Sequence, residues 1–336
     1  MHPAGPQPRP RLLGPLLAAS AVLLLVLYYC HSSAWRDPAL QVEEVAGTEA
    51  EAGALEEPPE VTTAAGWPNS TCGEGATARG PGQRVVAFSY YGDVNNTRGY
   101  YTGIERNAAA IGGLYPGWTM RVYHDVPPGD RFAASRELDR LSREFPHLDL
   151  CYVGDVPGYG DLRGRQQNAW RFLAMADPLV DVFISRDLDA LPLEREVGAV
   201  REWLESNATF HVMRDHTGHN VPILAGMWGA RPELKREALK ALAEVITGEP
   251  KGKKGQDQWL LAKHVWPNIR GDVWQHDAFY CHKYSSHGHM RAFPTPRNHT
   301  VVYNFVGNRF GVDTQPLVKE CPQQCRPADH QDWLYC

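Results

Sequence analysis

The chain has 336 residues, of which 43% are hydrophobic and 22% charged, and its formal net charge is −5. With 10 Trp, 14 Tyr and 10 Phe it can build a sizeable packed core. The charge is uneven, because residues 31–82 hold nine acids and two bases whereas residues 83–336 are neutral overall. This balance excludes a general nucleic-acid binder, which needs a clustered basic face.

An uncharged apolar run, LLGPLLAASAVLLLVLYY, occupies residues 12–29. As a helix it would be about 27 Å long, close to the hydrocarbon thickness of about 30 Å. Arg9 and Arg11 precede the run and acids follow it, so the positive-inside rule places the remainder in the lumen. We predict a cytoplasmic tail at residues 1–11 and a transmembrane signal-anchor at residues 12–29. A cleaved signal peptide is the alternative.

Residues 30–82 are rich in Ala, Glu, Gly, Pro and Thr and poor in aromatic residues. Such a composition buries too little surface to offset the entropy of ordering the chain. We therefore predict a disordered luminal stem, followed by one globular domain at residues 83–336.

Sequons and cysteines also indicate export. Four N-x-[ST] sequons occur, at Asn69, Asn95, Asn207 and Asn298. Six of the seven cysteines follow the apolar run and its flank, an even set that predicts disulfides in an oxidising compartment. Cys321, Cys325 and Cys336 are expected to fix the C-terminal tail. A zinc site that combines them with His330 is the alternative.

Apolar strands and amphipathic helices alternate from residue 84 onward. The run 85–90 predicts a buried strand that ends at Tyr90. Further strands are predicted at residues 119–123, 149–153 and 182–185, with helices at 101–111, 131–145 and 166–175 between them. This alternation predicts an α/β fold with a mostly parallel sheet flanked by helices, whose ligands bind at the carboxyl ends of the strands.

The fourth predicted strand is followed directly by Asp187-Leu188-Asp189. In an extended segment, residues i and i+2 share a face, so the two carboxylates are expected to point the same way. Paired hard oxygen ligands suit Mg²⁺ or Mn²⁺, which would neutralise charge on a departing nucleoside diphosphate. Arg186 is a candidate partner for the phosphates. A solvated acidic turn before the next helix is the alternative reading.

These features together resemble the GT-A superfamily of nucleotide-sugar glycosyltransferases. The resemblance rests on the stem, the first strand at Val85, the alternating units and the motif ISRDLDA, and it covers about residues 84–296. It implies a Rossmann-like domain that uses Mn²⁺ or Mg²⁺ and a nucleotide sugar. It also implies that Arg171, in NAWRFLAMADP, turns toward the donor, and we assign Tyr90 to the donor side as well. The order of tail, anchor, stem and luminal domain is similar to that of type II Golgi transferases, so we expect a Golgi or ER membrane location.

Two later segments supply the other candidates. The run 209–216 reads as a strand that ends in polar residues. The resemblance implies that the loop at this place lines the donor sugar and the acceptor, which makes Asp215 and His216 candidates for sugar contacts or for the catalytic base. The run leads to Gly226-Met227-Trp228, where Gly226 would admit backbone close to the ligand and Trp228 would stack on a sugar. A tryptophan buried in a tight turn is the alternative.

Asp257 opens a late helix in Gly255-Gln256-Asp257-Gln258. It can cap that helix, and the resemblance implies that such a pair also faces the acceptor. The resemblance further implies a late histidine as third metal ligand, for which we choose His276, with His287 or His289 as the second choice. If the reaction inverts configuration, Asp257 or Asp215 would be the base.

The sequence thus predicts a metal-dependent glycosyltransferase that uses a UDP- or GDP-sugar and a hydroxyl acceptor on a glycan, protein or lipid. A phosphohydrolase built on Asp187, Asp189 and the His276-Asp277 pair is a second hypothesis. A non-catalytic luminal glycan-binding protein with the same fold is the third. The sequence predicts no oligomeric state, donor sugar or linkage.

Overall fold

The computed structural model describes residues 66–92, 100–129, 131–253 and 255–336. The predicted cytoplasmic tail, the signal-anchor and most of the predicted stem lie outside these residues, as does the sequon at Asn95. Within the described ranges, no helix combines the length and apolar character needed to cross a bilayer.

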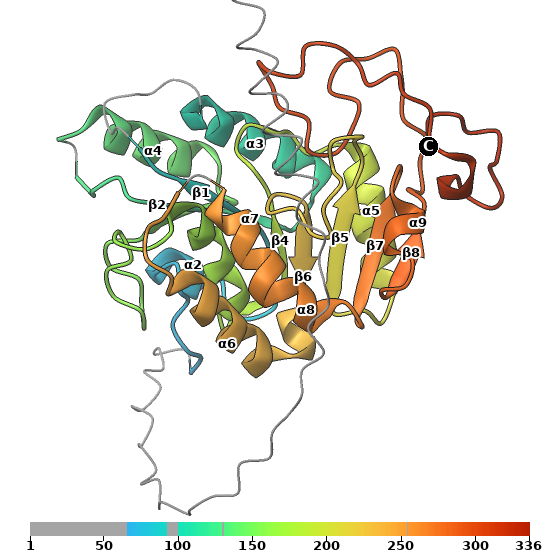
Figure 1. Ribbon diagram of the computed structural model, residues 1–336. Helices are drawn as coiled ribbons and strands as arrows, with labels where there is room; N and C mark the ends of the chain where they lie inside the picture. The colour runs from blue at the N-terminus through green and yellow to red at the C-terminus, as the bar shows by residue number, and fades with distance from the viewer. Residues whose placement is uncertain (1–65, 93–99, 130, 254) are drawn as a thin grey trace, which may run out of the picture. The chain divides into compact units, whose positions relative to one another are not determined.

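The described strands form one eight-stranded sheet with the order β3-β2-β1-β4-β6-β5-β7-β8 (Figure 1). The strands are β1 (Gln83–Tyr90), β2 (Thr119–His124), β3 (Leu148–Tyr152), β4 (Val180–Ser185), β5 (Phe210–Arg214), β6 (Trp228–Ala230), β7 (Val273–Asp277) and β8 (His289–Arg291). The pairings between these strands are parallel, except those of β6 with β4 and β5. The predicted α/β class and mostly parallel sheet are confirmed.

Helices cover both faces of the sheet. Those described are α2 (Glu74–Ala78), α3 (Tyr100–Leu114), α4 (Ala133–Glu144), α5 (Glu194–Glu205), α6 (Arg236–Thr247), α7 (Gln256–Leu260), α8 (Trp266–Ile269) and α9 (Cys281–Tyr284). The 3₁₀ segments are η1 (Gln167–Ala176), η2 (Pro232–Leu234) and η4 (Gln323–Cys325), and η3 (Leu261–Val265) is a π-helical turn. The predicted helix at residues 166–175 is therefore a 3₁₀ helix.

The side chains of β1 divide between two cores. Val85 and Ala87 join a cluster with η1, α6, α7 and α8, whereas Val86 and Phe88 join a cluster with α3, α4 and α5. All four side chains are fully buried. Because successive strand residues point to opposite faces, a continuous apolar run is what a strand covered on both faces requires. In Figure 1, α6, α7 and α8 lie together on one side of the sheet.

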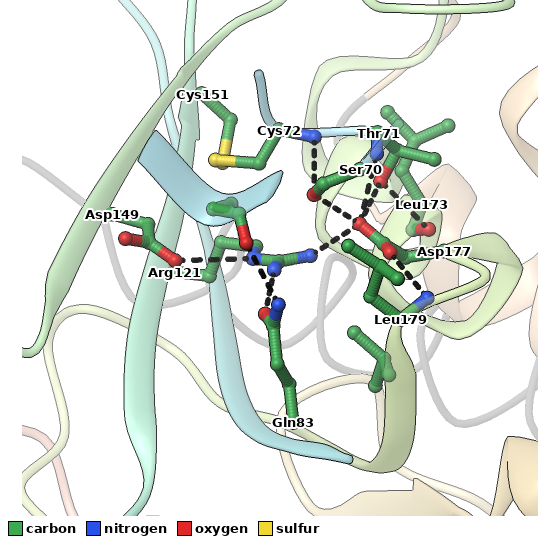
Figure 2. A network of polar contacts seen from close by, with 12 residues as sticks. Ser70, Thr71, Cys72, Gln83, Arg121, Asp149, Cys151, Leu173, Asp177 and Leu179 are labelled. Atoms are coloured by element: carbon green, nitrogen blue, oxygen red, sulfur yellow. Dashed lines mark hydrogen bonds and ion pairs between the residues drawn. A yellow bond between two sulfur atoms is a disulfide. The ribbon is translucent and has the colours of Figure 1, made fainter. Parts of the chain in front are cut away.

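The N-terminal described segment, residues 66–82, packs on this domain and corrects the predicted end of the stem. Ser70 and Thr71 both donate to the carboxylate of Asp177, with oxygen–oxygen distances of 2.5 and 3.0 Å. The same carboxylate accepts from Arg121 at 2.7 Å, and all these side chains are buried (Figure 2). The composition of residues 66–82 did not indicate this packing. Its partners are distant in sequence, since Arg121 lies about 50 residues and Asp177 lies 106 residues after Thr71.

Three disulfides join the six described cysteines, which confirms the prediction of disulfides. They are Cys72–Cys151, Cys281–Cys325 and Cys321–Cys336. Two of them fix the C-terminal tail, which runs past β7, β8 and α9 in Figure 1. The zinc alternative is wrong, because its cysteines are paired with one another or with Cys281. Cys281, His282 and Cys325 have ligand-like spacing, but the disulfide removes both thiolates.

Candidate active site

The site begins where the strand order changes direction. Strand β1 pairs with β2 on one side and with β4 on the other, both in parallel. In sheets of this type, the loops that leave such neighbouring strands diverge and open a crevice at their carboxyl ends. The segment that leaves β4 carries Asp187 and Asp189, and the segment that leaves β1 carries Tyr91. The sequence motif therefore lies at the position where topology creates a cleft.

Three hydrogen bonds hold the turn that contains the two aspartates, one within the turn, one from α3 and one from the C-terminal tail. The N–H of Ala190 donates to the carbonyl of Asp187 at 3.1 Å and closes the turn. From α3, the amide of Asn107 donates to the carbonyl of Leu188 at 3.2 Å. A Cβ on Gly103 would lie 2.1 Å from that carbonyl, so the helix approaches this closely only because residue 103 is glycine.

The C-terminal tail supplies the third contact. The N–H of Phe310 donates to the carbonyl of Asp189 at 2.8 Å. The ring of Phe310 lies 5.0 Å from the guanidinium carbon of Arg106 on α3. The tail is therefore fixed against both the aspartate turn and the helix behind it.

Asp187 and Asp189 line the same cavity, whose volume is about 270 Å³, while Leu188 between them is buried. The side chain of Asp187 is 52% exposed. Burial, and then the nearby charge of Asp187, raise the pKa of Asp189 above its ordinary value. Tyr90 also lines this cavity and packs edge-on against Tyr101. Leu188 also lines this cavity, and the segment turns after β4 ends at Ser185, so the two aspartates share a cavity without the i, i+2 strand alternation expected from the sequence.

Arg171 of η1 links the carboxylates across the cleft floor. Its Nη1 lies 2.5 Å from Asp187 Oδ1 and 2.7 Å from the carbonyl oxygen of Arg186, and its Nη2 lies 3.1 Å from Asp257 Oδ2. The Arg171 side chain is 4% exposed. The carboxylates raise the pKa of Arg171 against the opposing effect of its burial. The guanidinium thus couples the aspartate turn to the start of α7.

The loop 223–226 presents Gly226 to Asp187. Ser185 Oγ donates to the carbonyl of Ala225 at 2.7 Å. The N–H of Ala225 donates to Gln258 Oε1 at 3.2 Å, and the Gln258 amide donates to the carbonyl of Ile223. A Cβ on Gly226 would lie 2.1 Å from Asp187 Oδ2. The pair Asp257-Gln258 therefore holds both Arg171 and this loop, in addition to opening α7.

A second cavity, of about 470 Å³, lies beside the first and shares Asp187, Asp257 and Arg309 with it. Its wall includes side chains from the tail that the sequence analysis missed, and the lining residues from that segment are Phe305, Gly307, Arg309 and Asp313. They lie beyond residue 296, where the resemblance ends. No local pattern marks them, because only the return of the tail to the sheet brings them to the cleft.

His216 and His219 line the second cavity as well. The N–H of Gly218 donates to His216 Nδ1 at 2.9 Å, and the N–H of Asp215 donates to His219 Nδ1 at 3.2 Å. Each neutral ring therefore carries its proton on Nε2. Burial lowers the pKa of both rings, to about 4 for His219. This tautomer makes His216 Nε2 a hydrogen-bond donor and disfavours its predicted role as base.

Arg186 and Trp228, which were predicted to contact the nucleotide sugar, point away from the cleft. Arg186 Nε donates to Glu196 Oε1 at 2.7 Å, and Tyr115 donates to the same carboxylate oxygen at 2.8 Å, all three residues being buried. Trp228 is fully buried in β6 and packs 5.4 and 5.3 Å from the rings of Phe172 and Phe183. Arg186 thus neutralises a buried acid, and Trp228 fills the core as the alternative reading had it.

Asp215 also lies outside both cavities. Arg195 binds its carboxylate through two contacts of 2.8 and 2.9 Å. It is fully buried and accepts from the N–H of Val306 at 2.9 Å. Asp215 therefore joins Arg195 of α5 to the C-terminal tail. It is not placed to take a proton from an acceptor.

His276 likewise lines neither cleft cavity. Its Nδ1 lies 2.8 Å from His211 Nε2, and its Nε2 lies 3.1 Å from Glu202 Oε2. The neighbouring Asp277 is fully buried and pairs with Arg214. Neither residue lines the cleft cavities, so the structure does not assemble the third metal ligand or the phosphohydrolase pair predicted from sequence.

No family model and no curated protein matches the chain. Among solved structures, one likeness is to a glycosyltransferase involved in glycosylation of the major capsid of PBCV-1. It has 11% identity and a TM-score of 0.33, and covers 63% of this chain and 94% of that one. Another is to 4-diphosphocytidyl-2C-methyl-D-erythritol synthase from Anaerococcus prevotii. It has 9% identity and a TM-score of 0.37, and covers 58% of this chain and 87% of that one. Both are likenesses of chain trace at low sequence identity.

Proposed function

We propose that the chain is a metal-dependent GT-A-type glycosyltransferase that moves a sugar from a UDP- or GDP-sugar to a hydroxyl on a glycan, protein or lipid. The observation that carries the proposal is the position of Asp187 and Asp189. Both carboxylates line one cavity at the strand-order switch between β1 and β4, and Arg171 binds one of them from the floor.

The donor set fits Mn²⁺ or Mg²⁺. Two carboxylates share the cavity, and the charge of Asp187 helps to raise the pKa of Asp189, so the pair carries repulsion that a cation would relieve. When bound, the ion would offset the charge that develops on the leaving diphosphate. Arg309, with a side chain that is 53% exposed and lines both cavities, takes the phosphate-binding role predicted for Arg186.

We assign different parts of the nucleotide sugar to the two cavities. Tyr90, Arg171 and Asp189 line the smaller cavity, which we assign to the nucleotide diphosphate. His216 lines the larger one, where its Nε2–H can donate to a sugar oxygen. Of the two aspartates predicted as the base, Asp257 lines the cleft and Asp215 does not. The ion pair of Asp257 with Arg171 fixes its position. If the product is inverted, Asp257 takes the acceptor proton.

Disulfides and sequons support a luminal location for this activity, with the predicted anchor in a Golgi or ER membrane. All six described cysteines are paired. The asparagines of the three described sequons, Asn69, Asn207 and Asn298, are exposed. Paired cysteines are typical of oxidising compartments.

The full chain, purified in detergent, should be assayed with a panel of UDP- and GDP-sugars, Mn²⁺ and mixed acceptors. We expect sugar transfer that EDTA abolishes, and its loss in Asp187→Asn and Asp189→Asn with melting temperatures close to the wild type. Asp139→Asn, on the exposed side of α4, is the matched control. Full activity in the double Asp187→Asn/Asp189→Asn variant would refute the proposal. Phosphate release without transfer would favour the phosphohydrolase, and the absence of any nucleotide-induced thermal shift would favour the non-catalytic protein.

A further inference from the structure

A cavity of about 780 Å³, larger than either cleft cavity, lies elsewhere in the domain. It is lined by the end of α5, by β7 and β8, and by the C-terminal tail, and it shares no lining residue with the candidate active site. These elements lie at the β8 end of the sheet, four strands away from β4 (Figure 1). Its size is in the range of ligand sites, about 300–1,000 Å³. We call it the β8–tail groove and define it by Glu202, Trp274, Arg291, Arg326, His330 and Trp333.

Flat side chains stand on both walls of the β8–tail groove. On the sheet side, the guanidinium carbon of Arg291 lies 4.8 Å from the ring centroid of Trp274. On the tail side, the rings of His330 and Trp333 stack with centroids 4.1 Å apart and planes 7° apart. Both tryptophans are only partly buried. Broad flat faces with a polar edge suit a ligand that has an apolar ring face and polar rim groups.

The charged groups of the groove oppose one another. Arg291 lies 3.9 Å from Glu202, and Glu202 also accepts a hydrogen bond from Nε2 of His276, at 3.1 Å. On the tail, Arg326 lies 3.9 Å from Glu320, and His330 Nε2 lies 3.7 Å from Asp329. Glu205 also lines the groove, so its acids, Glu202, Glu205 and Asp329, outnumber its arginines, Arg291 and Arg326, which disfavours phosphates and other polyanions. Intermixed donors and acceptors instead match hydroxyl groups, which do both.

We propose that the β8–tail groove binds a neutral oligosaccharide, separately from the proposed transfer reaction. Aromatic rings and charged side chains of both signs line the groove together. Because the groove and the cleft share no residue, binding here requires neither the metal nor the nucleotide. The groove would hold a glycan chain on the domain at a distance from the reacting hydroxyl.

One source of that glycan lies on this chain. Asn207, the exposed asparagine of a sequon, follows Ser206, which lines the groove. A glycan attached there would have a high effective concentration at the groove. The other source is a free or acceptor-borne glycan. Both present the same chemistry, and a variant at Asn207 distinguishes them.

The test uses the full-length chain in detergent, without metal or nucleotide. The probes are the N-glycan core pentasaccharide, maltoheptaose and chitotetraose, and binding is followed by saturation-transfer NMR and tryptophan fluorescence. We expect at least one probe to bind Asn207→Gln, and its affinity to fall by at least about tenfold in Arg291→Ala and in Trp333→Ala on that background. Arg291 is exposed, so its variant should fold even if Trp333→Ala does not. On the same background, Asp187→Asn should bind the probe as strongly as Asn207→Gln alone does.

Three outcomes would overturn the inference. They are no binding of any probe to Asn207→Gln, unchanged affinity in folded Arg291→Ala and Trp333→Ala, or equal loss in Asp187→Asn. Binding by Asn207→Gln but not by wild type would show that the chain's own glycan fills the groove. Asn298→Gln, at another exposed sequon, is the matched control and should behave as wild type. Loss of transfer activity alone would count against the proposed function and leave this binding intact.

Discussion

The backbone of Gly226 lies directly against the carboxylate of Asp187. A Cβ at residue 226 would come within 2.1 Å of Asp187 Oδ2 and 2.5 Å of its Cγ. The loop that carries Gly226 is held by Ser185 and Gln258, so it cannot retreat freely. This contact fixes one side of the aspartate, and Arg171 fixes the other.

Gly226→Ala should displace Asp187 and reduce Mn²⁺-dependent nucleotide binding by about tenfold or more, since misplacing a site group by about 1 Å has effects of this order. The φ of Gly226 is not positive, so alanine fits the backbone and the fold should persist. Thermal shift with UDP and Mn²⁺ measures the effect. Gly164→Ala, where a Cβ meets nothing within 4 Å, is the control. Equal nucleotide binding in the two variants would contradict the assigned contact.

Arg171 and Asp257 form a buried ion pair whose members should be coupled. Their side chains are 4% and 10% exposed. Arg171→Met leaves the Asp257 charge buried without its partner and should lower the free energy of unfolding by about 3–5 kcal/mol. Adding Asp257→Asn should recover part of that loss, because the stranded charge is removed. Urea denaturation of the two single variants and the double variant measures this, and strictly additive losses would argue against the pair.

Buried neutral histidines should make the domain less stable in acid. Burial lowers the pKa of His124 and of His219 to about 4 from the ordinary 6.5. Between these pH values, the two histidine rings bind protons in the unfolded chain but not in the folded chain. The free energy of unfolding therefore falls as pH drops from 6.5 to 4. Each ring contributes at most about 3 kcal/mol to that fall, and nothing above pH 7.

Urea midpoints at pH 7, 5.5 and 4.5 would measure this slope. His124→Gln should flatten it, because glutamine binds no proton. His124 lies outside the cleft cavities, so its variant tests stability without touching the proposed active site. An unchanged slope would mean that the His124 ring does become protonated in the folded state.

The Cys72–Cys151 disulfide closes a span of 79 residues and ties the N-terminal segment to β3. Chain-entropy arguments give about 4 kcal/mol for a loop of this length. Cys72→Ser/Cys151→Ser should therefore unfold at clearly lower urea concentration than wild type. Protease cleavage near residues 66–82 should also become faster, because only non-covalent contacts, such as those of Ser70 and Thr71 with Asp177 and of Arg79 with Asp149, then hold the segment. Cleavage at the wild-type rate would show that the polar contacts suffice.

Much of the scaffold could be predicted from the sequence. A strand buried on both faces must be apolar throughout, as residues 85–88 are, and the helices between such strands leave few alternatives to a parallel sheet. The sequence motif also indicated that Asp187 and Asp189 lie together, and they do line one cavity, although in a turn after β4 and not in a strand. The disulfide content was predicted from an even set of cysteines after the apolar run, and all six are paired.

The tertiary structure alone decided which polar and aromatic side chains reach the cleft. Arg186 turns to Glu196 and Trp228 to Phe172, because a buried acid needs a counterion and an indole fills core volume well. Phe305 and Asp313 enter the site because the tail returns to a sheet whose motif lies more than 100 residues earlier. Local pattern specifies burial and period, whereas the partner of a side chain depends on contacts that only the folded chain makes.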